Sequence, residues 1–308
     1  MESIKSAMEQ FMKNRDFMQQ YDTLKEQLYE DRRIQAFLKE HPTVTTEVIE
    51  RSLTKLFEFK GERTNCDACP GLDACKNMIQ GYQPELIEGR GRIELQYNPC
   101  ELKRKYDERK QQQELIKSLH VPKEILQASF DQLDQDNERM TASAAALEFA
   151  INAQPGEDGR GLYFYGQFGV GKTYIMGAIA QELADRNIET LLVYTPDFFR
   201  EIKNSLGDGT FNEKIEKVKR AQVLILDDIG AENMSSWIRD EVLGVILQYR
   251  MMEKLPTLYT SNYDLDELEE HLSYSEKGGI EQLKAKRIME RIRHYTKPIF
   301  IKGRNRRS

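Results

Sequence analysis

The chain has 308 residues, of which 39% are hydrophobic and 31% are charged, and its formal net charge is −6. This length allows two domains, and the composition is that of a globular protein rather than a disordered or membrane-embedded chain. No apolar run reaches the roughly 20 residues that a membrane-spanning helix needs. The N-terminus also lacks the apolar core of a signal peptide, so we expect a cytoplasmic protein without membrane contact.

The charge is distributed unevenly along the chain. Residues 1–106 are close to neutral at −1, whereas residues 283–308 carry 10 basic side chains and one acidic side chain. The remainder therefore has a charge of −14. A basic segment on an acidic body indicates a phosphate-bearing partner, either a nucleotide or a nucleic acid, and a solvated arm is the alternative.

The N-terminal part is expected to be mainly helical. Apolar residues recur at helical spacing over residues 1–56, which predicts three amphipathic helices, and Phe11, Phe17 and Tyr21 are candidates for exposed partner contacts. The turn sequence GRG within ELIEGRGRIELQY predicts a β-hairpin.

A polar segment separates two expected domains. The sequence ELKRKYDERKQQQELIKSL has little apolar face, which indicates an exposed helical connector. We therefore expect a helical, zinc-binding domain over residues 1–106, a charged helical linker over residues 107–125 and a second domain over residues 126–308.

All four cysteines lie in one window, at Cys66, Cys69, Cys75 and Cys100. Because a cytoplasmic chain rarely keeps disulfides, the spacing predicts a tetrahedral Zn²⁺ site made of four thiolates. Such a closed site is structural, since it leaves no position for water, and it would add folding free energy to a small domain. Two alternatives stay open: buried free thiols, and an iron–sulfur cluster, whose common ferredoxin spacings this segment does not match.

The second domain has the pattern of an α/β fold. Short apolar runs alternate with long helical stretches, and these runs are GLYFYG, TLLVYT, VLILDD, TLYTSN and KPIFI. The alternation predicts a parallel sheet of five strands with helices on both faces.

A glycine-rich motif follows the first of these strands. Residues 166–173 read GQFGVGKT, which fits the P-loop pattern G-x-x-x-x-G-K-T, and helical sequence follows. In such a loop backbone N–H groups surround a phosphate of ATP, Lys172 reaches the β and γ oxygens, and the Thr173 hydroxyl coordinates Mg²⁺. The predicted nucleotide-binding residues are Gly166, Gly169, Val170, Gly171, Lys172, Thr173 and Tyr174. A glycine turn without a ligand is the alternative that this context disfavours.

Polar residues end two further strands. Asp227 ends the run VLILDD and is expected to hold Mg²⁺, while Asp228 stands where hydrolysing ATPases of this type commonly use Glu to polarise water. The shorter carboxylate predicts slow hydrolysis. Asn262 follows TLYTS and is expected to hydrogen-bond water or the γ-phosphate. For Asp228 and Asn262, a local turn is the alternative.

The order of these motifs resembles the AAA+ ATPases of the initiator and helicase-loader branch. More narrowly, GQFGVGKT, LILDDIGAE, SNY and RIMERI are similar to the bacterial DnaC-type loaders and their DnaI relatives, over about residues 118–308, and the cysteine-bearing N-terminal domain points to the DnaI side. The resemblance implies a loader that binds a hexameric replicative helicase through its N-terminal domain, self-assembles around ATP, and places the helicase on single-stranded DNA during initiation of replication.

The resemblance also assigns a role to the arginines near position 290. By its place in the motif Arg291 matches the arginine finger that completes a neighbouring subunit's ATP site, with Arg287 and Arg293 beside it. Surface ion pairs, for example with Glu290, are the alternative. Members of this branch often carry a second arginine on a helical lid. Here only GRNRRS follows the last strand, so we expect no complete lid, and Arg304, Arg306 and Arg307 are unranked candidates for that arginine.

Residues for DNA contact are less well indicated. Phe198, Phe199, Arg200 and Lys203 offer aromatic and basic groups on one predicted helix, and core packing is the alternative for the aromatic pair. Three other functions stay open: an IstB-like transposition helper ATPase, which shares the ATPase motifs, a small-molecule P-loop kinase, and an adaptor that binds nucleotide without hydrolysis.

Overall fold

The structure is a computed structural model of the chain, and it describes residues 23, 25–66, 68–133, 137–275 and 279–306. Contacts divide the chain into two compact units, Met1–Arg109 and Lys110–Ser308. The candidate contact residues Phe11, Phe17 and Tyr21 lie outside the described residues.

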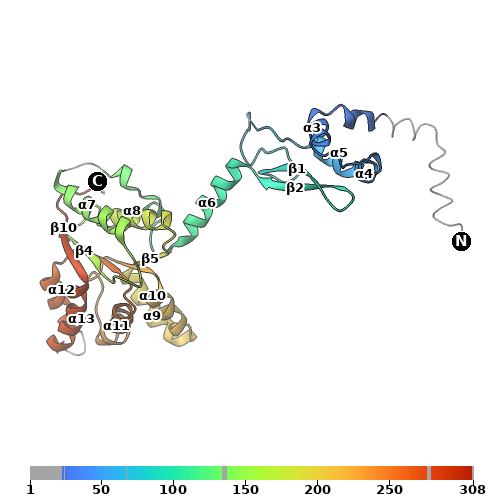
Figure 1. The fold of residues 1–308 in the computed structure, drawn as a ribbon. Helices are drawn as coiled ribbons and strands as arrows, with labels where there is room; N and C mark the ends of the chain where they lie inside the picture. The colour runs from blue at the N-terminus through green and yellow to red at the C-terminus, as the bar shows by residue number, and fades with distance from the viewer. Residues whose placement is uncertain (1–22, 24, 67, 134–136, 276–278, 307–308) are drawn as a thin grey trace. The chain divides into compact units, whose positions relative to one another are not determined.

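The first unit packs short helices against a hairpin (Figure 1). Its elements are α3 (Arg32–Glu40), α4 (Thr46–Arg51), α5 (Leu53–Gly61), β1 (Tyr82–Glu88) and β2 (Ile93–Pro99), followed by α6 (Glu101–Leu115). The hairpin predicted from the GRG turn is confirmed: β1 and β2 are antiparallel, and Gly89 N donates to Arg92 O at 2.8 Å.

Capping and burial explain this arrangement. The side chain of Asp31 caps α3, and that of Thr45 caps α4. The apolar faces meet the hairpin in a core that contains Leu28, Ile34, Phe37, Ile49, Leu53, Leu56, Phe59, Leu86 and Ile93. The buried Ser52 hydroxyl accepts from Ile93 N at 2.7 Å, which ties the helices to β2.

The second unit is built on a parallel sheet of six strands in the order β10-β4-β7-β6-β5-β3. The strands are β3 (Ile116–Leu119), β4 (Gly161–Tyr165), β5 (Thr190–Tyr194), β6 (Val223–Asp227), β7 (Thr257–Ser261) and β10 (Thr296–Phe300). The expected α/β class is confirmed, and the expected number of five strands is wrong.

The additional strand lies inside the segment expected to be a helical linker. Helix α6 has no buried residue, in agreement with an exposed connector, but it ends at Leu115 and the next four residues form β3. Strand β3 pairs in parallel with β5, and Lys117 forms an ion pair with Glu189 at 2.6 Å. A partner 72 residues away in the sequence therefore turns this short polar run into an edge strand.

Helices cover both faces of the sheet (Figure 1). One face holds η1 (Ile125–Gln127), η2 (Phe130–Gln132), α7 (Asn137–Asn152) and α8 (Lys172–Asp185). The other holds α9 (Thr195–Asp208), α10 (Phe211–Arg220), the π-helical turn η3 (Ile238–Leu243), α11 (Gly244–Met252), α12 (Leu265–Ser273) and α13 (Gln282–Tyr295). A small pair, β8 (Tyr274–Ser275) and β9 (Gly279–Ile280), lies between α12 and α13 in the sequence.

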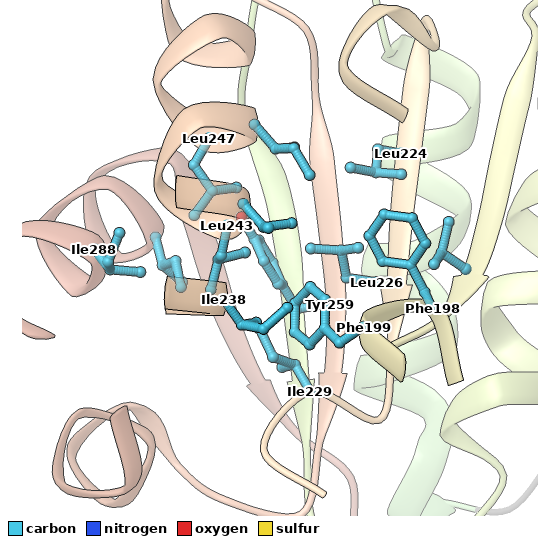
Figure 2. Packing of buried hydrophobic residues seen from close by; sticks show 14 of the residues in the cluster. Phe198, Phe199, Leu224, Leu226, Ile229, Ile238, Leu243, Leu247, Tyr259 and Ile288 are labelled. Atoms are coloured by element: carbon cyan, nitrogen blue, oxygen red, sulfur yellow. The ribbon is translucent and has the colours of Figure 1, made fainter. Parts of the chain in front are cut away.

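The central strands are apolar on both faces. In β6, Leu224 and Leu226 enter the core beside α9 and α11, whereas Val223 and Ile225 enter the core beside α7 and α8. Figure 2 shows the first of these cores around Leu226 and Tyr259. Because both faces are buried, each strand is held in place along its own axis relative to its neighbours. The carboxyl ends of the strands therefore lie at one edge of the sheet, where the polar residues gather.

Candidate nucleotide site

The P-loop connects β4 to α8 at the carboxyl edge of the sheet. Lys172 is buried, and its Nζ donates to Gly166 O at 2.8 Å, to Gln167 O at 2.9 Å and to Asn262 Oδ1 at 2.8 Å. Gly171 caps α8 with φ +92°, and a Cβ there would lie 2.7 Å from Nη2 of the buried Arg139. Sequence reasoning missed Arg139, because nothing local to α7 indicates that it packs against this loop.

Thr173 and Asp227 meet at the first turn of α8. The Thr173 hydroxyl donates to Asp227 at 2.9 Å, and the Thr260 hydroxyl donates to the same carboxylate at 2.6 Å. Asp227 is almost fully buried, and burial raises its pKa, with the charge of Asp228 acting in the same direction. The Thr173 hydroxyl and the Asp227 carboxylate offer only oxygen atoms, the ligands that a hard divalent cation prefers. A bound cation would also offset the cost of burying the carboxylate, so these residues fit Mg²⁺.

Asp228 and Asn262 stand next to each other across two strands. Asn262 Nδ2 donates to Asp228 Oδ1 at 2.9 Å, and Asp228 N donates to the Thr260 hydroxyl at 2.8 Å. Strand β7, which leads to Asn262, lies between the P-loop strand β4 and the Asp227 strand β6. Asp228 has φ +59°, a left-handed conformation in which Asp and Asn are the most tolerated side chains after Gly.

The structure therefore brings Lys172, Thr173, Asp227, Asp228 and Asn262 into one hydrogen-bonded group, here called the P-loop group. The flanking residues of the motif face other surroundings. Val170 is buried in the core beneath the loop, and the Tyr174 hydroxyl donates to Gln132 at 2.9 Å.

Glu232, four residues beyond Asp228, was not expected from the sequence. Its side chain is buried, and burial raises its pKa to about 7. One carboxylate oxygen accepts from Gly230 N at 3.0 Å, while its backbone carbonyl lies 3.1 Å from His271 Nε2. Burial lowers the pKa of His271. The loop after β6 is thereby held to α12, and an acidic residue in a short turn gave no signal of this burial.

The arginines of α13 have different surroundings. Arg291 Nη1 donates to Gly244 O at 3.0 Å, and Arg293 pairs with Asp266 at 2.6 Å and Glu269 at 3.3 Å. Arg287 is exposed. Among the described residues, Arg291 makes no hydrogen bond to the P-loop group of its own chain. Arg293 therefore forms ion pairs within its own chain, which was the alternative to a role beside an arginine finger.

The aromatic pair considered for DNA contact is part of the core. Phe198 is 1% exposed and Phe199 is 3% exposed, and both lie in the cluster around Leu226 and Tyr259 (Figure 2). Neither ring is available to stack on a base, so that expectation is wrong. Arg200 and Lys203 are exposed, and Arg200 pairs with Asp197 at 2.8 Å.

The residues after β10 form no helix within 301–306, the part of this segment that the structure describes. Arg306 N donates to Gly169 O at 3.0 Å, which places this segment against the P-loop. Arg304 is exposed, and Arg307 lies outside the described residues.

All four cysteines line one cavity of about 290 Å³ in the first unit. They are free thiols, of which Cys100 is buried. Gln83 Nε2 donates to Cys66 Sγ at 3.3 Å, and Gly81 N donates to Cys75 Sγ at 3.4 Å. Among the described residues, however, no three Cys, His, Asp or Glu side chains are grouped closely enough to hold a metal ion. The thiols thus share a cavity without forming a finished metal site.

A P-loop follows β4, two acidic residues stand at the end of β6, and an asparagine follows β7, the strand between β4 and β6. These features define an ATP-binding domain of the AAA+ class. A family model described as the primosomal protein DnaI N-terminus matches residues 1–97, and one described as an IstB-like ATP-binding protein matches residues 97–308. The chain is 43% identical to the replicative helicase loader DnaI of Bacillus subtilis, over 100% of this chain and 99% of that protein. The chain belongs to the DnaI family of helicase loaders.

Solved structures agree with this assignment. A crystal structure of DnaI is 50% identical, covers 64% of this chain and 99% of that chain, and superposes with a TM-score of 0.56. A crystal structure of the DnaC helicase loader is 26% identical, covers 59% of this chain and 100% of that chain, and has a TM-score of 0.51. The described residues include no helix that is long and apolar enough to cross a bilayer.

Proposed function

We propose that the protein loads a hexameric replicative helicase onto single-stranded DNA during initiation of replication, and that it uses ATP as a timing switch. The observation that carries this proposal is the joint match of both halves to DnaI, together with a hydrogen-bonded P-loop group in the second half. An IstB-like transposition helper shares the ATPase half, but it offers no reason for the match of residues 1–97 to the DnaI N-terminus.

The residues of the P-loop group divide the chemistry of ATP hydrolysis among them. Backbone N–H groups of the P-loop and Lys172 bind the phosphates, and Thr173 with Asp227 would hold Mg²⁺. The metal ion supplies charge neutralisation on the phosphate oxygens when it is bound. Asp228 accepts the proton of the attacking water, and Asn262 orients that water or the γ-phosphate. Because Asp228 is shorter than Glu, hydrolysis is slow, which suits a switch.

Arg291 acts on the ATP of a neighbouring subunit. Its place on α13, outside the P-loop group of its own chain, supports a role in trans. The protein therefore assembles through ATP-bridged interfaces. An arginine that neutralises charge developing on the γ-phosphate raises hydrolysis by orders of magnitude in related NTPases.

The N-terminal unit binds the helicase, and Zn²⁺ stiffens it. Two N–H groups donate to thiol sulfurs, those of Cys66 and Cys75, and all four cysteines line one cavity. Cys66, Cys69, Cys75 and Cys100 are the residues that would hold the ion, and a site made of four thiolates would be structural rather than catalytic. The metal content of the purified chain, compared with that of Cys75→Ser, tests this part. One zinc per chain in the wild type and its loss in the variant would support it, and a zinc-free, folded wild type would contradict it.

Native mass spectrometry of the full chain with the hexameric replicative helicase of the same organism, ATP and Mg²⁺ tests the loader function. We expect a complex that forms with the wild type and changes stoichiometry in Lys172→Ala, which cannot hold the phosphates. A chain that hydrolyses ATP without binding the helicase would contradict the loader function and favour the transposition helper.

A further inference from the structure

The segment after β10 runs beside the P-loop because of the strand order. Strands β10 and β4 are parallel neighbours, so the residues that follow each of them leave the sheet at the same edge. Ile301 N continues the ladder with a bond to Tyr165 O at 2.7 Å. Ile301 is fully buried, so the start of this segment is anchored in the core.

Two P-loop glycines are in close contact with this segment. A Cβ at Gly166 would lie 2.2 Å from Ile301 O, and a Cβ at Gly169 would lie 2.0 Å from Asn305 Oδ1. Gly169 also accepts a hydrogen bond from Arg306 N at 3.0 Å. Both glycines have positive φ, +147° and +76°, so the loop is held in a conformation that other residues rarely adopt.

A glycine-rich loop must lose conformational freedom before it can surround a phosphate. Contacts that hold the loop in advance reduce that cost and so increase nucleotide affinity. The backbone N–H of Arg306 contacts the carbonyl oxygen of Gly169 and not an N–H group of the loop. It is also basic, with Lys302, Arg304 and Arg306 and no acidic residue from 301 onward.

We propose that residues 303–306, here called the strap, are positioning residues of the nucleotide site. Asn305 and the backbone N–H of Arg306 hold Gly169 in the conformation that accepts a triphosphate. Binding of ATP and ordering of the strap stabilise each other, because a coupling between two sites is reciprocal. This inference rests on the proposed binding of ATP by the P-loop.

Substitutions at one position separate the backbone contact from the charge. Arg306→Pro removes the N–H that donates to Gly169, whereas Arg306→Ala keeps it and removes only the guanidinium. Isothermal titration of the full chain with ATP and Mg²⁺ gives the affinity, and thermal unfolding without nucleotide reports folding. Asn305→Ala and deletion of residues 303–308 test the remaining contacts. Lys110→Ala, on the exposed helix α6, controls for the loss of one positive charge.

We expect Arg306→Pro to weaken ATP binding by about fivefold, the usual worth of one hydrogen bond. Asn305→Ala removes the side chain that lies against Gly169 and should weaken binding as well. The deletion should weaken it further, with unchanged melting temperatures. Arg306→Ala should bind ATP more tightly than Arg306→Pro. If the proline variant and the deletion both bind ATP within twofold of the wild type, the proposed role of the strap is wrong. If alanine and proline at position 306 weaken binding equally, the proposed role of the backbone N–H is wrong. A wild type that binds no ATP would instead refute the proposed nucleotide function.

The reciprocal effect can be measured without any substitution. Trypsin cleaves after the arginines of the strap, so bound ATP should slow the loss of the residues beyond Arg304 from the wild-type chain. Cleavage at the same rate with and without ATP, at saturating nucleotide, would contradict the coupling.

Discussion

Asn262 connects Asp228 to Lys172: its Nδ2 donates to Asp228 Oδ1 at 2.9 Å, and its Oδ1 accepts from Lys172 Nζ at 2.8 Å. Asn262→Ala should lower kcat for ATP hydrolysis by roughly 10- to 100-fold, because it removes the amide that we propose to orient the attacking water or the γ-phosphate. ATP affinity should fall less than fivefold, since Lys172 keeps its bonds to Gly166 O and Gln167 O. Phosphate-release kinetics and titration separate the two effects, and an equal loss in both would argue against this role.

The left-handed backbone conformation of Asp228 predicts which side chains this position tolerates. With φ at +59°, Asp228→Asn should fold normally, because Asn tolerates this region, and should lose at least roughly 100-fold in hydrolysis for want of a proton acceptor. Asp228→Glu should lose about 1 kcal/mol of stability, since the longer side chain is less tolerated there. Denaturant unfolding and phosphate release test both variants. A Glu variant as stable as the wild type would contradict the backbone argument for Asp at this position, and one that hydrolyses no faster would contradict the link between the shorter side chain and slow hydrolysis.

Glu232 makes stability depend on pH. Its pKa rises from 4.5 in the unfolded chain to about 7 in the folded one, so the unfolded state releases its proton first as pH rises. The contribution of this group to stability therefore falls between about pH 4.5 and 7 and stays low above that. Glu232→Gln cannot ionise and should be more stable than the wild type at pH 8, by roughly 1–3 kcal/mol.

Melting temperatures of both proteins from pH 5 to 8 check the effect of Glu232. The difference between them should shrink toward pH 5, where the wild-type carboxyl is protonated in the folded state. Asp227 titrates in the same direction but is present in both proteins, so it cancels. An offset that is the same at every pH would show that packing, not ionisation, separates the two.

Arg291 allows a test by mixing. If it acts in trans, Arg291→Ala and Asp228→Asn should each be inactive alone, and an equimolar mixture should recover part of the ATPase activity at interfaces that combine one intact finger with one intact site. A mixture as inactive as its components would place Arg291 in a structural role, consistent with its bond to Gly244 O. Arg293→Ala, which removes an ion pair with Asp266, is the matched control.

Local sequence was sufficient to predict the residues of the P-loop group. The P-loop, Asp227 and Asn262 each end an apolar run, and the alternation of strands and helices indicated that these ends would share one edge. The hairpin was equally readable from its turn. Each of these features depends on residues close by in the sequence or on the general rule that alternating strands and helices form a parallel sheet.

Long-range contacts decided what the sequence could not predict. Strand β3 exists because β5 is beside it, and Phe198 and Phe199 are buried because β6 offers an apolar face to α9. Arg139 and the strap contact the P-loop from a helix and a segment distant in sequence, and neither carries a motif. Glu232 follows Asp228 closely, but its burial depends on the packing of its loop against α12. Burial of a polar residue is a property of the whole packing arrangement, which periodicity along one segment does not contain.

The two edges of the six-stranded sheet limit how copies of this chain can join. Edge strand β3 has only four residues, and edge strand β10 contains Pro298, which has no N–H to offer an incoming strand, beside the exposed Lys297. Short edges, proline and lysine discourage the open-ended addition of one sheet to the next. If copies of this chain assemble through ATP-bridged interfaces, as proposed above, these edges would protect the assembly from irreversible aggregation through its own sheets.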